Sequence, residues 1–122
     1  MERNVFTSEQ ELWLKALESG QYAQGRERLK RSCGTYAEFC CLGVACEIGL
    51  AQPDMGNHYL CDDKLNLRNG RGGFLDAVII DGIRFGGVAN MNDKGWSFAQ
   101  IAAFIRSQPW QVFTNFDAPA QP

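Results

Sequence analysis

Five cysteines lie in 122 residues, and three of them fall in the stretch FCCLGVACEI at 39–48. Thiols can act as nucleophiles, bind metals or pack as small apolar side chains. Cys40 and Cys41 lie near the start of a predicted helix, whose dipole would stabilise a thiolate. The only histidine, His58, would then be the general base of a cysteine-dependent hydrolase. The apolar neighbours favour the alternative, in which the thiols are buried and inert.

A metal site is another use of the same side chains. His58 and Cys61 have the spacing of a ligand pair, but the sequence contains no second pair of the CxxC kind. Cys40 and Cys41 are adjacent, so on a helix they point about 100° apart and rarely bind one ion together. We therefore expect no metal and no other cofactor.

Basic side chains are concentrated in the run GRERLKR at 25–31, close to Tyr22. Positive charge beside an aromatic ring suits a nucleotide or a nucleic acid. The alternative is an ordinary solvated strand face. The candidate binding residues of this run are Arg26, Arg28 and Arg31.

A glycine-rich loop, RNGRGG at 68–73, supplies a second candidate anion site with Arg68 and Arg71. Backbone amides and guanidinium groups in such a loop can hold an anion. The loop lacks the GxxxxGK[ST] pattern of a P-loop, and a solvated turn is the alternative. Trp96 is a candidate stacking side chain for a bound base.

The composition is that of an ordinary globular domain, with 45% hydrophobic and 21% charged residues. The net charge of only −2 gives no reason to expect non-specific nucleic-acid binding by the whole surface. No apolar run approaches the roughly 20 residues of a membrane span, and the N-terminus has no apolar signal region. We expect a cytoplasmic chain with reduced cysteines and no membrane partner.

The periodicity of apolar residues predicts helices at 8–18 and 98–107. At 39–49 periodicity does not separate a buried strand from a buried helix, but the length of the run, its small residues and the polar Glu47 near its end favour a third helix. Ser8 with Glu11, and Ser97 with Gln100, have capping-box spacing. Gly20 is the expected stop of the first helix.

The remaining elements are expected to be short. A strand near 27–31 turns at 32–34 and pairs with 35–37, and a second short strand is expected at 58–61 within a long loop at 51–73. Residues 75–85 fit a strand or a helix equally well. A turn is expected at 92–95, a packing tail or strand at 110–116, and a frayed end at 117–122. The sequence thus predicts one α+β domain over 1–122, with about three helices, a small antiparallel sheet and a long middle loop.

Three blocks of the sequence resemble a family of small proteins common in bacteriophage and prophage genomes. Their pattern is W-x-x-AL-x-SG-x-Y-x-Q-x-x-x-x-L, then CCLGVLC, then LND-x-G-x-(S/T)F-x-x-IA-x-x-I. It falls here on Trp13, Ala16, Leu17, Ser19, Gly20, Tyr22, Gln24 and Leu29; on Cys40, Cys41, Leu42, Gly43, Val44 and Cys46; and on Asn92, Asp93, Gly95, Ser97, Phe98, Ile101, Ala102 and Ile105. The chain departs from the pattern at Ala45, Glu47, Asp76 and Met91.

The resemblance implies a phage or prophage accessory protein that is expressed in the cytoplasm of a bacterial host. It implies no shared catalytic residue. Proteins of this kind often inhibit host defence, CRISPR systems among them, and we expect a non-enzymatic binding module that occupies a host protein surface. The first alternative is a pocket protein that sequesters a nucleotide-derived immune signal, and the second is the cysteine hydrolase. Nucleic acid is a weaker candidate partner, and a homo-oligomer stays open.

Overall fold

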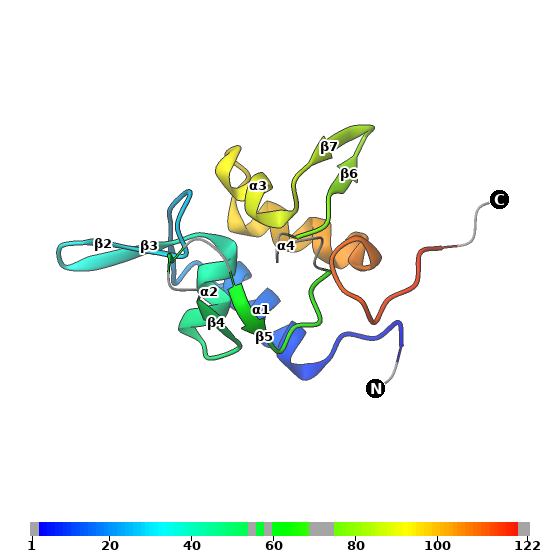
Figure 1. Cartoon of the computed structure of the whole chain (residues 1–122), viewed down its shortest axis with the longest axis horizontal. Coiled ribbons are helices and arrows are strands. Elements are labelled where there is room, and N and C mark those ends of the chain that lie inside the picture. The colour runs from blue at the N-terminus through cyan, green and yellow to red at the C-terminus, as the bar shows by residue number, and fades with distance from the viewer. Residues whose placement is uncertain (1–2, 54–55, 58–59, 69–74, 120–122) are drawn as a thin grey trace.

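A computed structural model describes residues 3–53, 56–57, 60–68 and 75–119. Helices and short strands follow one another along the chain (Figure 1). The helices are α1 (Ser8–Glu18), α2 (Cys41–Glu47), α3 (Val88–Asp93), α4 (Phe98–Ser107) and the 3₁₀ helix η2 (Pro109–Gln111). The strands are β1 (Ala23–Gln24), β2 (Lys30–Cys33), β3 (Tyr36–Phe39), β4 (Ala51–Pro53), β5 (Leu60–Asp63), β6 (Val78–Ile80) and β7 (Ile83–Phe85).

The strands form three small sheets, which confirms the predicted α+β class. In the first sheet β3 lies between β1 and β2, parallel to β1 and antiparallel to β2. The pairs β4–β5 and β6–β7 are antiparallel. The hairpins β2–β3 and β6–β7 extend away from the helices in different directions (Figure 1).

The first and last predicted helices are confirmed at their predicted bounds. The cap of α4 is the expected one, with the Ser97 hydroxyl accepting from the Gln100 amide. The cap of α1 lies one residue earlier than predicted, because Thr7 and Gln10, rather than Ser8 and Glu11, form the capping box. Both pairs have the same spacing in sequence, so the pattern alone could not separate them.

The middle helix is shorter than predicted. Phe39 ends strand β3, and Cys40 is the N-cap, whose Sγ accepts from the Gly43 amide at 3.4 Å. The helix thus begins at Cys41, and it ends at Glu47 after about two turns. Periodicity could not show this boundary, because an inward-facing strand end and a buried helix start are both apolar.

Two hairpins form in the segments for which a hairpin, or either a strand or a helix, was expected. The first, β2–β3, turns at Gly34, whose φ is +78°, and its strands lie one to three residues later than predicted. Residues 78–85 form the strands β6 and β7 rather than a helix. Asp81 and Gly82 join them with positive φ angles of 51° and 79°, as a tight two-residue hairpin turn requires.

Two further elements differ from expectation. The turn expected at 92–95 is preceded by a short helix, α3, which the sequence pattern missed. The strand expected at 58–61 is found as β5, shifted to Leu60–Asp63, and residues 58–59 lie outside the described chain.

The core forms around α2, whose residues from Cys41 to Ala45 are all buried. The Trp13 indole of α1 donates to the Cys41 carbonyl at 2.9 Å. Gly43 packs against the backbone ahead of β2 so closely that an added Cβ would lie 1.7 Å from the Leu29 carbonyl oxygen. A side chain at position 43 would therefore push α2 away from the hairpin.

The tail after η2 packs against this core. Phe113 is fully buried and meets Trp13 edge-on, with ring centroids 6.1 Å apart. The buried Gln10 amide donates to the Asn115 side chain at 2.7 Å. Asp117, expected to begin a frayed end, pairs with Arg3 at 2.6 Å on the surface. Residues 120–122 of that end lie outside the described chain.

Replacing Gly43 with alanine should lower the free energy of unfolding by about 3 kcal/mol, because overpacking a rigid contact costs roughly that much. Urea unfolding would measure the loss. Gly86→Ala is the matched control: its Cβ would meet the nearest atom, in Asn90, at 3.5 Å, an ordinary contact. We expect the control to stay within about 0.5 kcal/mol of the parent. Equal effects of the two changes would contradict the packing described for α2.

Candidate binding surfaces

The double cysteine is built into the core. Cys41 is fully buried, and its Sγ donates to the Val88 carbonyl at 3.5 Å. Burial raises the pKa of the Cys41 thiol well above its ordinary value. Burial also raises the pKa of Cys40, whose sulfur caps α2 by accepting a hydrogen bond from the Gly43 amide. Both thiols are thus held in the protonated form at neutral pH, the opposite of an activated nucleophile.

The other candidate groups for thiol or metal chemistry do not assemble a site in the described chain. Cys33 is half-buried, with Sγ 3.4 Å from a Glu38 carboxylate oxygen; desolvation first, and then Glu38, raises its pKa. Cys46 is also half-buried. His58 lies outside the described residues, as does the side chain of Cys61. Within the part that is described, no three potential ligands gather around one point.

Alkylation of the folded protein should follow this burial. Iodoacetamide should label the half-buried Cys33 well before the buried Cys40 and Cys41, and peptide mass spectrometry would report each rate. Denatured protein serves as the control, in which all of these thiols react. Fast labelling of Cys41 in the native state would contradict its burial.

Stability should also fall in alkali. Because the folded state raises the pKa of Cys40 and Cys41, it retains protons that the unfolded chain loses above about pH 8.5. The free energy of unfolding should then drop by up to about 1.4 kcal/mol per pH unit for each thiol. Urea titrations between pH 7 and 10 would measure the slope. Cys41→Ala should flatten it; an unchanged slope would contradict the assignment.

Hydrogen bonds from the end of α3 hold the segment that leads into the β2–β3 hairpin. We call the group formed by Gln24, Gly25, Glu27, Asn92 and Asp93 the polar joint. The fully buried Asn92 side chain donates to the Gly25 carbonyl at 2.8 Å and accepts from the Gln24 amide at 2.8 Å. The Asp93 carboxylate accepts from the Glu27 amide at 2.8 Å. The joint therefore fixes the path of the chain on both sides of Gly25.

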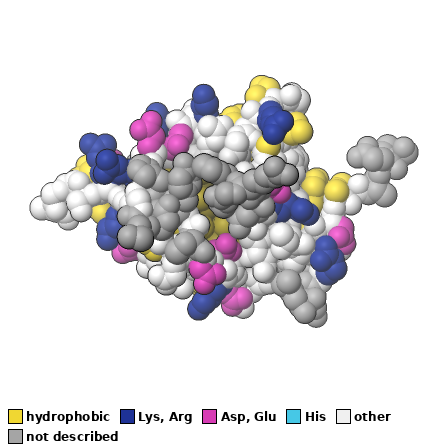
Figure 2. Space-filling view, in the orientation of Figure 1, with side chains coloured by type: hydrophobic (Ala, Val, Ile, Leu, Met, Phe, Trp, Pro, Cys, Tyr) yellow, Lys and Arg dark blue, Asp and Glu magenta, His cyan; other side chains and the backbone are white. Residues whose placement is uncertain are grey.

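The arginines predicted for the run at 25–31 lie beyond this joint, where the chain enters the hairpin. We call Arg26, Arg28, Lys30 and Arg31 the basic arm. Lys30 already has two partners, because its Nζ lies 3.6 Å from Glu47 and 5.8 Å from the centre of the Phe39 ring. The side chains of the three arginines make no hydrogen bond or ion pair with the described residues, and all three are exposed. Figure 2 shows Lys and Arg side chains at this end of the molecule.

Strand register places one aromatic ring beside this arm. Arg31 pairs with Glu38 and Cys33 pairs with Tyr36, so these four side chains share one face of the hairpin. The other face carries Phe39 into the core. Tyr36 is 58% exposed. Sequence reasoning missed Tyr36 as a candidate, although strand alternation after the glycine turn could have indicated it.

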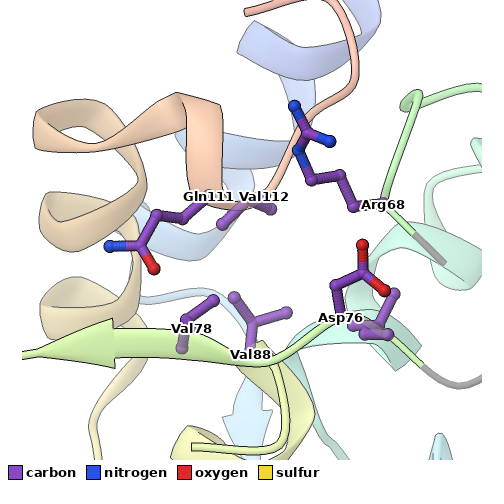
Figure 3. A pocket seen from close by; sticks show the side chains of 7 residues that line it. Arg68, Asp76, Val78, Val88, Gln111 and Val112 are labelled. Atoms are coloured by element: carbon purple, nitrogen blue, oxygen red, sulfur yellow. The ribbon is translucent and has the colours of Figure 1, made fainter. Parts of the chain in front are cut away.

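Arg68 does not join the basic arm. Its Nε donates to the Trp110 carbonyl at 2.8 Å, and a terminal nitrogen reaches the Phe116 carbonyl at 3.5 Å. The side chain thus holds the tail and borders a small crevice that Asp76 and Gln111 also line (Figure 3). The Gln111 side-chain amide also binds the edge of β6: it accepts from the Ile79 amide and donates to the Ile79 carbonyl. Arg71 lies outside the described residues.

The two predicted stacking aromatics are half-buried. Trp96 meets Phe85 edge-on at 5.8 Å, and its carbonyl accepts from Gln24. Tyr22 meets Phe39 edge-on at 5.8 Å. Tyr22 also lines an open groove beside α1. We call this the α1 groove; its lining residues are Leu12, Lys15, Ala16, Ser19, Gln21, Tyr22 and Ile48.

The fold is that of a small α+β domain. The chain belongs to a family described as a domain of unknown function (DUF8296), which matches residues 7–69. That segment runs from the cap of α1 through the double cysteine to one residue beyond Arg68. Comparison with curated proteins and comparison with solved structures each gave no match. No described helix has the length and apolar character needed to cross a membrane.

Proposed function

We propose that this protein is a phage or prophage accessory protein that acts as a non-enzymatic binding module. It would inhibit a host defence system in the bacterial cytoplasm by occupying a protein surface, and the basic arm would make the contact. The observation that carries the proposal is the set of three exposed arginines, whose side chains form no hydrogen bond or ion pair with the described residues, on and beside a hairpin whose turn end projects away from the helices (Figure 1).

The chemistry of the arm suits a protein partner with an acidic surface. Arginine and tyrosine are the residues that most often dominate binding energy at interfaces, and Tyr36 lies on the same face as Arg31. The arm carries excess positive charge in a chain whose net charge is −2, so it would steer an acidic partner to this end. The polar joint at Asn92 holds the hairpin base, which limits the ordering needed on binding.

The alternatives draw less support from the site. A hydrolase needs a thiolate, whereas burial raises the pKa of both candidate thiols. A nucleotide site built on Arg68 would compete with the backbone carbonyls that this side chain already binds. The nucleotide alternative has a direct test, because a ligand at 100 times its Kd adds about 2.7 kcal/mol of stability. Because Arg68 is already bonded, we expect a thermal-shift screen against linear and cyclic nucleotides to show no change in melting temperature.

The proposal is tested by expressing the protein in bacterial strains that each carry one defence system, CRISPR systems included, and counting phage plaques. Wild type should restore plaquing in at least one strain. Arg28→Glu with Arg31→Glu should abolish that effect, because it reverses two charges of the arm. Affinity for the purified target should fall about hundredfold, as expected for the loss of charged interface contacts.

Lys64→Glu with Lys94→Glu is the matched control. Both lysines are exposed and lie outside the basic arm, and the change in net charge is the same. This variant should keep full activity. Equal loss in both variants would show a general charge effect and would contradict a role for the arm, and so would failure of wild type in every strain.

A further inference from the structure

Side chains at the end of α3 hold the backbone of Arg26 on both sides. The carbonyl of Gly25, in the peptide group before Arg26, accepts from the Asn92 side chain at 2.8 Å. The amide of Glu27, in the peptide group after Arg26, donates to the Asp93 carboxylate at 2.8 Å. Two consecutive residues of α3 therefore fix both peptide groups that set the direction of the Arg26 side chain.

The backbone at Glu27 shows that these contacts determine the path of the chain. Glu27 has a φ of +69°, in the left-handed region that residues with a Cβ seldom adopt. Such a conformation persists only where the surrounding structure requires it. The Asp93 carboxylate supplies that requirement by accepting from the Glu27 amide. Close packing at Gly25 fixes the other side, because a Cβ there would lie 2.8 Å from the Glu38 Cβ.

The Arg26 side chain lies against the turn between α3 and α4. Its terminal nitrogen Nη2 is 3.5 Å from the position that a Cβ on Gly95 would occupy. Arg26 is nevertheless exposed, and its guanidinium forms no hydrogen bond or ion pair with the described residues. The paired donors of a guanidinium match the two oxygens of a carboxylate. Because the backbone is fixed and the side chain rests on a turn, less ordering is needed when a carboxylate binds.

We propose that Arg26 is the anchor by which the basic arm binds a carboxylate of its protein partner, and that Asp93 is the residue that positions Arg26. The inference rests on the proposed function, because it names the pair of residues through which the arm engages an acidic surface. Asp93 acts through the Glu27 amide and does not touch the partner. Arg28 and Arg31 add positive charge farther along the arm.

Nuclear magnetic resonance tests the positioning role in the unmodified protein. Glu27 should show the strong contact between its own amide and Hα protons that a positive φ produces. Its amide should exchange more slowly than that of Arg28, which bonds to no described residue. Asp93→Asn retains an acceptor oxygen and should keep both signals, whereas Asp93→Ala should lose both. A negative φ at Glu27 in wild type, or equal behaviour of the two variants, would overturn the inference.

Binding of a fluorescein-labelled oligoglutamate peptide at low salt, followed by anisotropy, tests the consequence. Asp93→Asn and Asp93→Ala remove the same negative charge, so electrostatics alone would strengthen binding equally in both. Loss of positioning should instead make Asp93→Ala bind about fivefold more weakly than Asp93→Asn. In an Arg26→Ala background the two variants should bind alike, because such a cycle isolates the coupling between the two positions. Far-UV circular dichroism checks that each variant is folded.

The outcomes separate this inference from the proposed function. A wild type that does not bind oligoglutamate would contradict the acidic partner and, with it, the anchor. Binding that survives Arg28→Glu with Arg31→Glu unchanged would do the same. If wild type binds through the arm, equal affinities of Asp93→Ala and Asp93→Asn would overturn the role of Asp93 alone. A difference between them that persists without Arg26 would overturn the assignment of Arg26 as the anchor.

Discussion

The contact between α2 and the backbone ahead of β2 constrains the rest of the fold. Gly43 lets the helix lie directly on the Leu29 carbonyl, and the Trp13 indole satisfies the Cys41 carbonyl from the other side. A two-turn helix has little stability of its own, so it depends on such packing. Compact, apolar residues are needed wherever two elements approach this closely, and thiols fill that role at Cys40 and Cys41.

The remaining elements are placed by what they bond to around that helix. The Asn92 joint ties the start of the first hairpin to α3, while Gln10 and Asn115 tie α1 to the tail. Arg68 holds the carbonyls of the same tail. Buried polar groups of this kind must be paired, so they fix one arrangement of the chain. The surface left outside these contacts includes the basic arm, the exposed side of α1 and the β6–β7 hairpin.

The sequence predicted best those elements that carry their own local signals. The helices at 8–18 and 98–107 have caps and a regular apolar stripe, and both were placed correctly. Position 39 was wrongly assigned to the middle helix, because a buried strand end and a buried helix start look alike in sequence. Arg68 looked like a free cation because its partners are backbone carbonyls more than 40 residues away. Tyr36 was missed because its exposure depends on the register of the hairpin.

Native-state hydrogen exchange tests most directly whether α2 is the element on which the fold depends. The amides of Val44 and Ile48 bond within the helix and its cap, to the carbonyls of Cys40 and Val44. They should exchange only through global unfolding, with an exchange free energy equal to that from urea denaturation. Amides of β6 and β7 should exchange faster by local opening. Exchange of the α2 amides at lower free energy than those of α4 would contradict the account.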